Sequence, residues 1–60
     1  MSEREAADRI WAGYYARVRG AYRVCAEAGD TDAAVAKRDA AVDRFHADLE
    51  TDLTDLYRRG

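Results

Sequence analysis

Apolar residues recur along residues 10–28 at the spacing of one face of an α-helix. At about 100° per residue they fall within an arc of roughly 180°. The arc contains Ile10, Trp11, Tyr14, Tyr15, Val18, Ala21, Tyr22, Val24, Cys25 and Ala28. One neighbouring helix covers a stripe of little more than about 100°. The pattern therefore predicts a helix with more apolar surface than a single partner helix can bury.

The ends of this first helix carry residues that satisfy free backbone groups. Ser2, followed three residues later by Glu5, has the spacing of a capping box. No proline interrupts the segment up to Ala28, and Gly29 suits the left-handed conformation that ends many helices. The first helix is expected over about residues 3–28.

A second amphipathic segment follows a short turn, expected at about residues 29–31. Asp30, Thr31 and Asp32 each suit the N-cap of a helix. The apolar positions after them span about 120°, which is typical of a helix packed on one neighbour. They are Val35, Val42, Phe45, His46, Leu49, Leu53, Leu56 and Tyr57. The second helix is expected over about residues 32–58, and so short a connection makes the two helices antiparallel.

With the turn centred near residue 30, residue i lies opposite roughly residue 60 minus i, which brings Tyr14 to the level of His46. Residues 1–29 carry five Arg and four Asp or Glu, whereas residues 30–60 carry five Lys or Arg and eight Asp or Glu. We therefore expect ion pairs between the helices that bias their register, each contributing about 0 to 1 kcal/mol. The side chains concerned are Arg4 and Arg9 on one helix and Asp48, Glu50, Asp52 and Asp55 on the other.

The small size of the chain predicts self-association. Sixty residues, expected as a single domain over 1–60, bury only about 60% of the surface that the unfolded chain exposes. Small proteins compensate with disulfides, metals or oligomerisation. One cysteine excludes an internal disulfide, and one cysteine with one histidine argues against a zinc site. The expected fold is an all-α, two-helix antiparallel hairpin that dimerises into a four-helix bundle.

The surplus aromatic surface is the expected interface, either with a second copy or with another protein. Tyr and Trp suit interfaces because they combine a large apolar area with a polar atom that reaches water. The expected interface residues are Ile10, Trp11, Tyr14, Tyr15, Val18, Tyr22, Phe45, Leu49, Leu53 and Leu56. Gly13 and Gly20, with Ala12 and Ala16, form a patch of small residues. It is either a second close-packing face or a tolerated weak helix interior.

The sequence favours structural roles for the residues that commonly bind metals. Asp43 and His46 have the carboxylate-x-x-His spacing of ferritin-like bundles, but those sites also need a glutamate from each facing helix. A core histidine bonded to a tyrosine hydroxyl is the favoured interpretation, and no metal or cofactor is expected. Cys25 lies at the middle of the arc and is expected to be a small buried residue. Arg38 falls within the second apolar stripe, so its stem should pack while its head stacks on a ring or meets a carboxylate across the dimer.

Two charged groups offer possible binding surfaces. Asp48, Asp52 and Asp55 form an acidic strip, either a solvated face or a docking site for a basic partner. Arg17, Arg19 and Arg23 interleave with tyrosines, a combination that suits single-stranded nucleic acid and RNA loops. A formal charge of −2 argues against nucleic-acid binding by bulk electrostatics.

The overall plan resembles the Rop family of plasmid regulators in architecture, with two nearly equal helices and a turn near residue 30 in a chain of about 60 residues. Rop dimerises into an antiparallel four-helix bundle and binds paired RNA loops. The resemblance covers the whole chain but rests on no shared motif. The resemblance therefore implies the dimeric architecture and does not carry over the RNA activity. The alternative function is a Rop-like dimeric RNA-binding modulator, with contacts from the arginine and tyrosine pattern of Arg17, Arg19 and Arg23.

The favoured function is a non-enzymatic interaction protein, acting as an adaptor, an assembly component or an inhibitor. No acid, base and nucleophile are spaced to converge in one pocket, so no enzyme activity is expected. No apolar run approaches 18 residues and no charged-then-apolar leader is present, so neither a membrane span nor a signal peptide is expected. A single unpaired thiol favours the cytoplasm.

Overall fold

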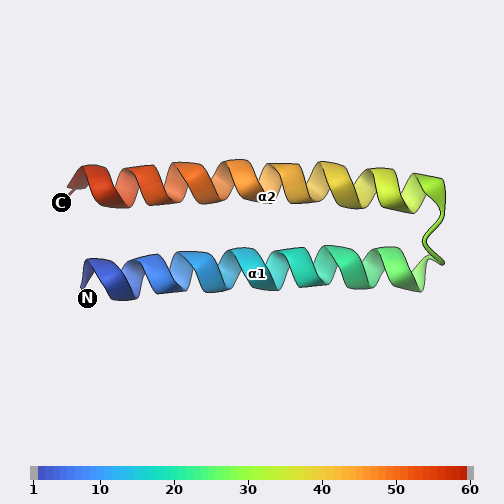
Figure 1. The fold of residues 1–60 in the computed structure, drawn as a ribbon, viewed down its shortest axis with the longest axis horizontal. Helices are drawn as coiled ribbons and strands as arrows, with labels where there is room; N and C mark the ends of the chain where they lie inside the picture. Colours follow the sequence, from blue (N-terminus) through green and yellow to red (C-terminus); the bar gives the residue numbers. More distant parts are fainter. Residues whose placement is uncertain (1, 60) are drawn as a thin grey trace.

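The computed structural model describes residues 2–59, which form two α-helices, α1 (Glu3–Glu27) and α2 (Asp32–Arg59), and no strand. The helices lie side by side and antiparallel, with both chain ends at one end and the turn at the other (Figure 1). The expected all-helical hairpin is confirmed. The helix bounds differ from the expected ones by one residue, because Ala28 forms the C-cap of α1 and Arg59 is still helical.

Side-chain hydroxyls cap the start of each helix. The backbone N–H of Glu5 donates to the Ser2 hydroxyl at 3.1 Å, which is one half of the expected capping box. Thr31 caps α2, since its Oγ1 accepts from the N–H of Ala34 at 3.2 Å and its carbonyl from Val35 at 2.8 Å. Of the three candidate caps in the turn, the structure therefore selects the threonine.

The turn reverses the chain through two residues with positive φ. Gly29 has φ of +82°, as expected for the residue that ends α1, and Asp30 follows at +53°. The N–H groups of Gly29 and Asp30 donate to the carbonyls of Ala26 and Cys25, each at 3.0 Å. These bonds satisfy carbonyls at the end of α1 that have no partner within the helix.

The core is a narrow line between the two helices. Only Cys25 and Leu49, 2% and 4% exposed, are buried among residues 2–59. The expected burial of Cys25 is thus confirmed. Other apolar side chains along the line are half-buried, and they include Ala7, Ile10, Tyr14, Val18, Ala21, Val35, Val42, Leu53 and Leu56.

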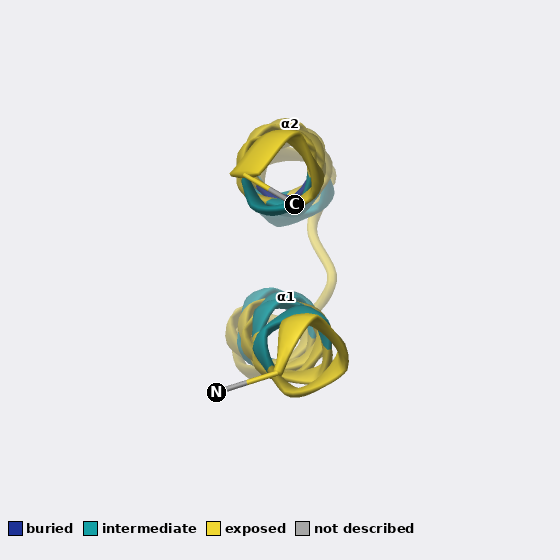
Figure 2. Ribbon diagram, turned by 90° about the vertical axis from the view of Figure 1, so that its left-hand side faces the viewer, coloured by how far each residue is buried: buried dark blue, intermediate teal, exposed yellow. Residues whose placement is uncertain are grey.

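The hairpin is a single layer of helices. Its Cα atoms extend over 44 × 16 × 7 Å, and the radius of gyration of 14.0 Å exceeds the value of about 10 Å typical of a compact chain of this length. Viewed end on, the two helices turn their half-buried sides toward each other and leave the rest exposed (Figure 2). Globular domains are usually built from at least two packed layers. Both broad faces of this hairpin are therefore uncovered.

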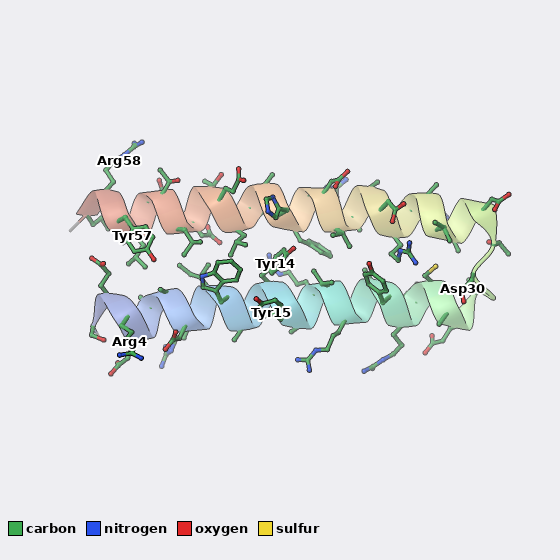
Figure 3. The ribbon with its side chains drawn as sticks, viewed as in Figure 1. Arg4, Tyr14, Tyr15, Asp30, Tyr57 and Arg58 are labelled. Atoms are coloured by element: carbon green, nitrogen blue, oxygen red, sulfur yellow. The ribbon has the colours of Figure 1, made fainter. Side chains whose placement is uncertain are left out.

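The expected ion pairs between the helices are absent from residues 2–59. Pairs within 4.0 Å in this range are Arg38–Asp39 at 3.1 Å and His46–Glu50 at 3.6 Å, both within α2. Arg4 points away from α2 (Figure 3). Packing along the core line, rather than charge, therefore sets the register. Neither helix, over the described residues, carries an apolar stretch long enough to cross a membrane.

Candidate interaction surfaces

One broad face of the hairpin contains two adjoining hollows, and we call it the groove face. The hollow nearer the turn has a volume of about 630 Å³, and the other, toward the chain ends, about 250 Å³. Arg17 and Phe45 line both, so the two hollows adjoin at these residues. The residues that define the groove face are Ile10, Gly13, Arg17, Gly20, Val24, Lys37, Ala41, Phe45 and Asp52.

Small and exposed apolar residues dominate the groove face. Val24 is 66% exposed, the highest value among the large hydrophobic side chains described. Apart from the adjoining residues and the backbone of α1 itself, no atom of residues 2–59 lies within 4 Å of the position that a Cβ would take at Gly13 or Gly20. Of the four residues in the expected patch of small residues, the two glycines line the hollows, whereas Ala12 and Ala16 do not. Val24 was not among the expected interface residues, although it lay at the edge of the apolar arc.

The opposite broad face carries rings, and we call it the aromatic face. It consists of Trp11, Tyr15 and Tyr22 from α1 and of His46 and Tyr57 from α2. Residues two positions apart on a helix point about 160° apart. Trp11 and Tyr22 therefore lie across α1 from Gly13 and Val24. The three tyrosines and Trp11 of this face are between 38% and 55% exposed.

The rings near the middle of the aromatic face contact one another. The Trp11 and Tyr15 ring centroids are 5.7 Å apart, and Tyr14 lies edge-on to Trp11 at 6.1 Å. Tyr14 reaches the space between the helices (Figure 3) and meets the His46 ring edge-on at 6.2 Å. The expected Tyr14–His46 register is confirmed. Aromatic pairs at these separations stabilise one another beyond the burial of their area.

His46 is not the core histidine expected from the apolar stripe. Its side chain is 57% exposed, and Nδ1 lies 3.6 Å from Oε1 of Glu50, one helical turn later. No hydrogen bond joins it to a tyrosine hydroxyl among the described residues. The reason is geometric: the core line of α2 runs through Leu49, and His46 lies at the edge of the stripe, beside the Tyr14 ring.

Arg38 behaves as its position in the apolar stripe predicts. Its guanidinium carbon lies 4.6 Å from the centre of the Tyr22 ring, a cation–π arrangement between the two helices. Nε and Nη2 both donate to Oδ1 of Asp39, at 3.2 and 3.1 Å. The hydrogen bond to Asp39 and its charge raise the pKa of Arg38, while burial opposes the shift. The carboxylate is on the same helix, so no second copy is needed for this contact.

The one thiol is held at the turn. Cys25 Sγ donates to Oδ1 of Asp30 at 3.3 Å. Burial raises the pKa of the Cys25 thiol, and the hydrogen bond and charge of Asp30 raise it further, while Arg38 opposes them. The neutral thiol is therefore favoured, which suits a structural residue rather than a nucleophile.

The ten expected interface residues do not share one surface. Trp11, Tyr15 and Tyr22 lie on the aromatic face, whereas Ile10 and Phe45 line the groove face. The other five lie along the line between the helices, half-buried or buried. They are Tyr14, Val18, Leu49, Leu53 and Leu56. The second helix thus occupies the middle of the apolar arc and divides the remainder between two faces.

The three arginines of the nucleic-acid hypothesis are also divided. Arg17 lines both hollows, and Arg19, two residues later, points about 160° away from it. Arg19 and Arg23 are one helical turn apart and both exposed. A phosphate backbone following one face would meet two of the three.

Within residues 2–59, no group of three or more His, Cys, Asp or Glu side chains is placed to hold a metal ion. Comparison with known protein families, curated proteins and solved structures finds no match to this chain. The two faces are therefore the features of the chain that bear on its function.

Proposed function

We propose that this chain is a small, non-enzymatic interaction protein of the cytoplasm that dimerises into a four-helix bundle and binds another protein through its remaining exposed surface. An adaptor, an assembly component and an inhibitor all fit this description. The observation that carries the proposal is the single-layer fold, which buries two of the residues from 2 to 59 and leaves two faces uncovered.

The surface area of the chain supports dimerisation. The accessible surface is 4691 Å², whereas a folded monomer of 6.7 kDa exposes about 3,900 Å². The excess of about 800 Å² equals what each partner buries in an interface of standard size. One further hairpin on one face would bring the surface into the range of ordinary globular proteins.

The chemistry of the surfaces supports binding rather than catalysis. The larger hollow is lined mainly by Gly, Ala, Val and Phe, side chains that pack against apolar groups and transfer no protons. The aromatic face presents one tryptophan and three tyrosines, the residue types enriched where proteins meet. A dimer that covers one face leaves the other for a different protein.

Sedimentation equilibrium across micromolar concentrations tests the dimer. We expect a species of twice the 6.7-kDa chain mass, with helix content lost on dilution in step with the mass. A single chain that unfolds cooperatively at these concentrations would refute dimerisation.

The alternative function, an RNA-binding modulator, is tested by a mobility-shift assay. It requires RNA hairpins to be retarded in a mobility-shift assay, with binding that weakens steeply as salt rises. Arg19→Ala and Arg23→Ala should then abolish the shift, while Arg44→Ala, on the other helix, serves as the matched control. Binding with this pattern would replace the protein-interaction proposal.

A further inference from the structure

We propose that the groove face packs against the groove face of a second copy of this chain. The two copies run in opposite directions, so that the turn of each copy lies over the end of the other copy that carries both chain termini, which we call the open end. The proposal rests on the dimer proposed above. It adds which face is covered and in which direction the copies run.

The shape of the groove face suits a helix packed closely against it. Val24 is 66% exposed, and the space beyond Gly13 and Gly20 is open to 4 Å. Each glycine costs a helix interior up to about 1 kcal/mol relative to alanine. The distance between packed helices, 8–10 Å, depends on the side chains at the contact, and small residues permit the shorter separations. A second hairpin on this face therefore fills the hollow of about 630 Å³ with side chains.

The aromatic face is less suited to an identical copy. Its rings already contact one another and the opposite helix, through Trp11–Tyr15, Tyr14–His46 and Arg38–Tyr22. Covering it would also desolvate the exposed charges of Asp39 and Glu50, which the structure pairs within α2. The groove face can be covered without burying these pairs.

The charges of the groove face determine the direction. Phe45 lies near the middle of α2 and lines both hollows. Lys37 edges the hollow on the turn side of Phe45, and Asp52, together with Arg9, edges the hollow on the open side, whereas Arg17 lines both. The acidic strip of residues 48, 52 and 55 continues along the open half.

Opposed turns bring unlike charges together. Lys37 precedes Phe45 by eight residues, and Asp52 follows it by seven. A twofold axis that passes Phe45 at right angles to the helices therefore places Lys37 of one copy at the level of Asp52 of the second copy. Turns at the same end would instead place Lys37 over the turn half of the second copy, where the hollow is lined by Lys37 and two arginines and by no carboxylate. Charge complementarity therefore selects the arrangement with opposed turns.

Zero-length carbodiimide cross-linking of the unmodified protein provides the direct test. Lys37 is the one lysine of the chain. Within one copy it is separated from the acidic strip by at least 11 residues of helix, about 16 Å, too far for an amide bond between the side chains. We expect peptide mapping of the cross-linked dimer to join Lys37 to Asp48, Asp52 or Asp55. Such a bond can form only between copies.

Substitutions test the face and the direction separately. Val24→Glu should weaken the dimer at least 100-fold, because it buries a charge without a partner, whereas Tyr15→Glu on the aromatic face should change it less than threefold. Lys37→Asp and Asp52→Lys should each weaken the dimer about tenfold, since symmetry repeats the contact twice. The double variant should restore it.

Each contrary result has its own meaning. A dimer that is broken by Tyr15→Glu but not by Val24→Glu, or that shows no bond from Lys37 to the acidic strip, overturns this inference and leaves the proposed dimer standing. A single-chain mass at all concentrations overturns both. A single chain that binds anilinonaphthalene sulfonate, and loses it on Val24→Glu, also overturns both proposals and shows that the hollow admits a small apolar molecule.

Discussion

The thiol of Cys25 donates a hydrogen bond to the carboxylate of Asp30, 3.3 Å away, and so ties the last turn of α1 to the residue that reverses the chain. A second bond joins the same two residues, from the N–H of Asp30 to the carbonyl of Cys25 at 3.0 Å. Asp30 has φ of +53°, a conformation that a residue other than glycine adopts at some cost. The paired contacts offset this cost and hold the turn in place.

Removing the charge of Asp30 should lower the pKa of Cys25. Burial is the main cause of the raised pKa, and the hydrogen bond and charge of Asp30 add to it. Asp30→Asn keeps a side chain that tolerates positive φ but removes the charge. We expect the ultraviolet absorbance of the thiolate to appear at lower pH in this variant than in the wild type. Asp43→Asn, which changes an exposed carboxylate in the middle of α2, should leave the titration in place.

The same shift should make stability fall at alkaline pH. The pKa of Cys25 in the folded protein lies above its ordinary value of 9.0, so the folded state binds the proton more tightly than the unfolded state. The resulting stability is fully present below the unfolded pKa and is lost as pH rises through the folded pKa. We expect urea unfolding to show a steeper decline above pH 9 for the wild type than for Cys25→Ala. Parallel curves for the two proteins would contradict the assignment.

Leu49 should be the most costly leucine to truncate. It is 4% exposed, whereas Leu53 is only half-buried. Leu49→Ala removes buried methyl groups and leaves a cavity, so we expect a loss of about 2–4 kcal/mol in the free energy of unfolding. Leu53→Ala should cost about half as much. Urea unfolding at one fixed protein concentration gives the comparison, and equal losses would place the core elsewhere.

Gly29 should resist substitution at the turn. Its φ of +82° is available to glycine but costs an L-residue about 1–2 kcal/mol. We expect Gly29→Ala to lower the free energy of unfolding by about 1 kcal/mol, and Gly29→Asn to cost less, because asparagine tolerates the left-handed region. Beyond residues 28 and 30, no atom of the described part of the chain lies within 4 Å of the added Cβ, so a loss measured by urea unfolding reports backbone conformation rather than a clash.

Local signals in the sequence predict the hairpin, whereas its faces depend on packing. Ser2, Gly29 and Thr31 act within one helical turn of chain, so their roles can be predicted from spacing alone. The apolar arc of α1 is wider than one helix can cover. Its angular width does not predict which residues of the arc pack against α2. The structure shows that α2 takes the middle, along Tyr14 and Cys25.

The packing of α2 against the middle of the arc also explains why two expectations, for His46 and for Arg4, were wrong. His46 lies beside the core line rather than on it, so water and Glu50 reach its ring. Arg4 extends from the outer side of α1, where no carboxylate of α2 is within reach. Periodicity predicts the helix face on which a side chain lies. The contacts of long side chains at the edge of a face also depend on how the helices pack, which periodicity does not give.

The contact between Arg38 and Tyr22 gives a test of this packing that is independent of any second copy. The guanidinium carbon lies 4.6 Å from the ring centre, across the two helices. Arg38→Lys keeps the charge but loses the flat surface that stacks on a ring, so we expect the Tm to fall by a few degrees. Tyr22→Leu removes the ring and should cause a loss of similar size. In the double variant the two losses should not add, because each single change already removes the shared contact. Full additivity in thermal unfolding at fixed protein concentration would show that the two side chains do not interact in solution.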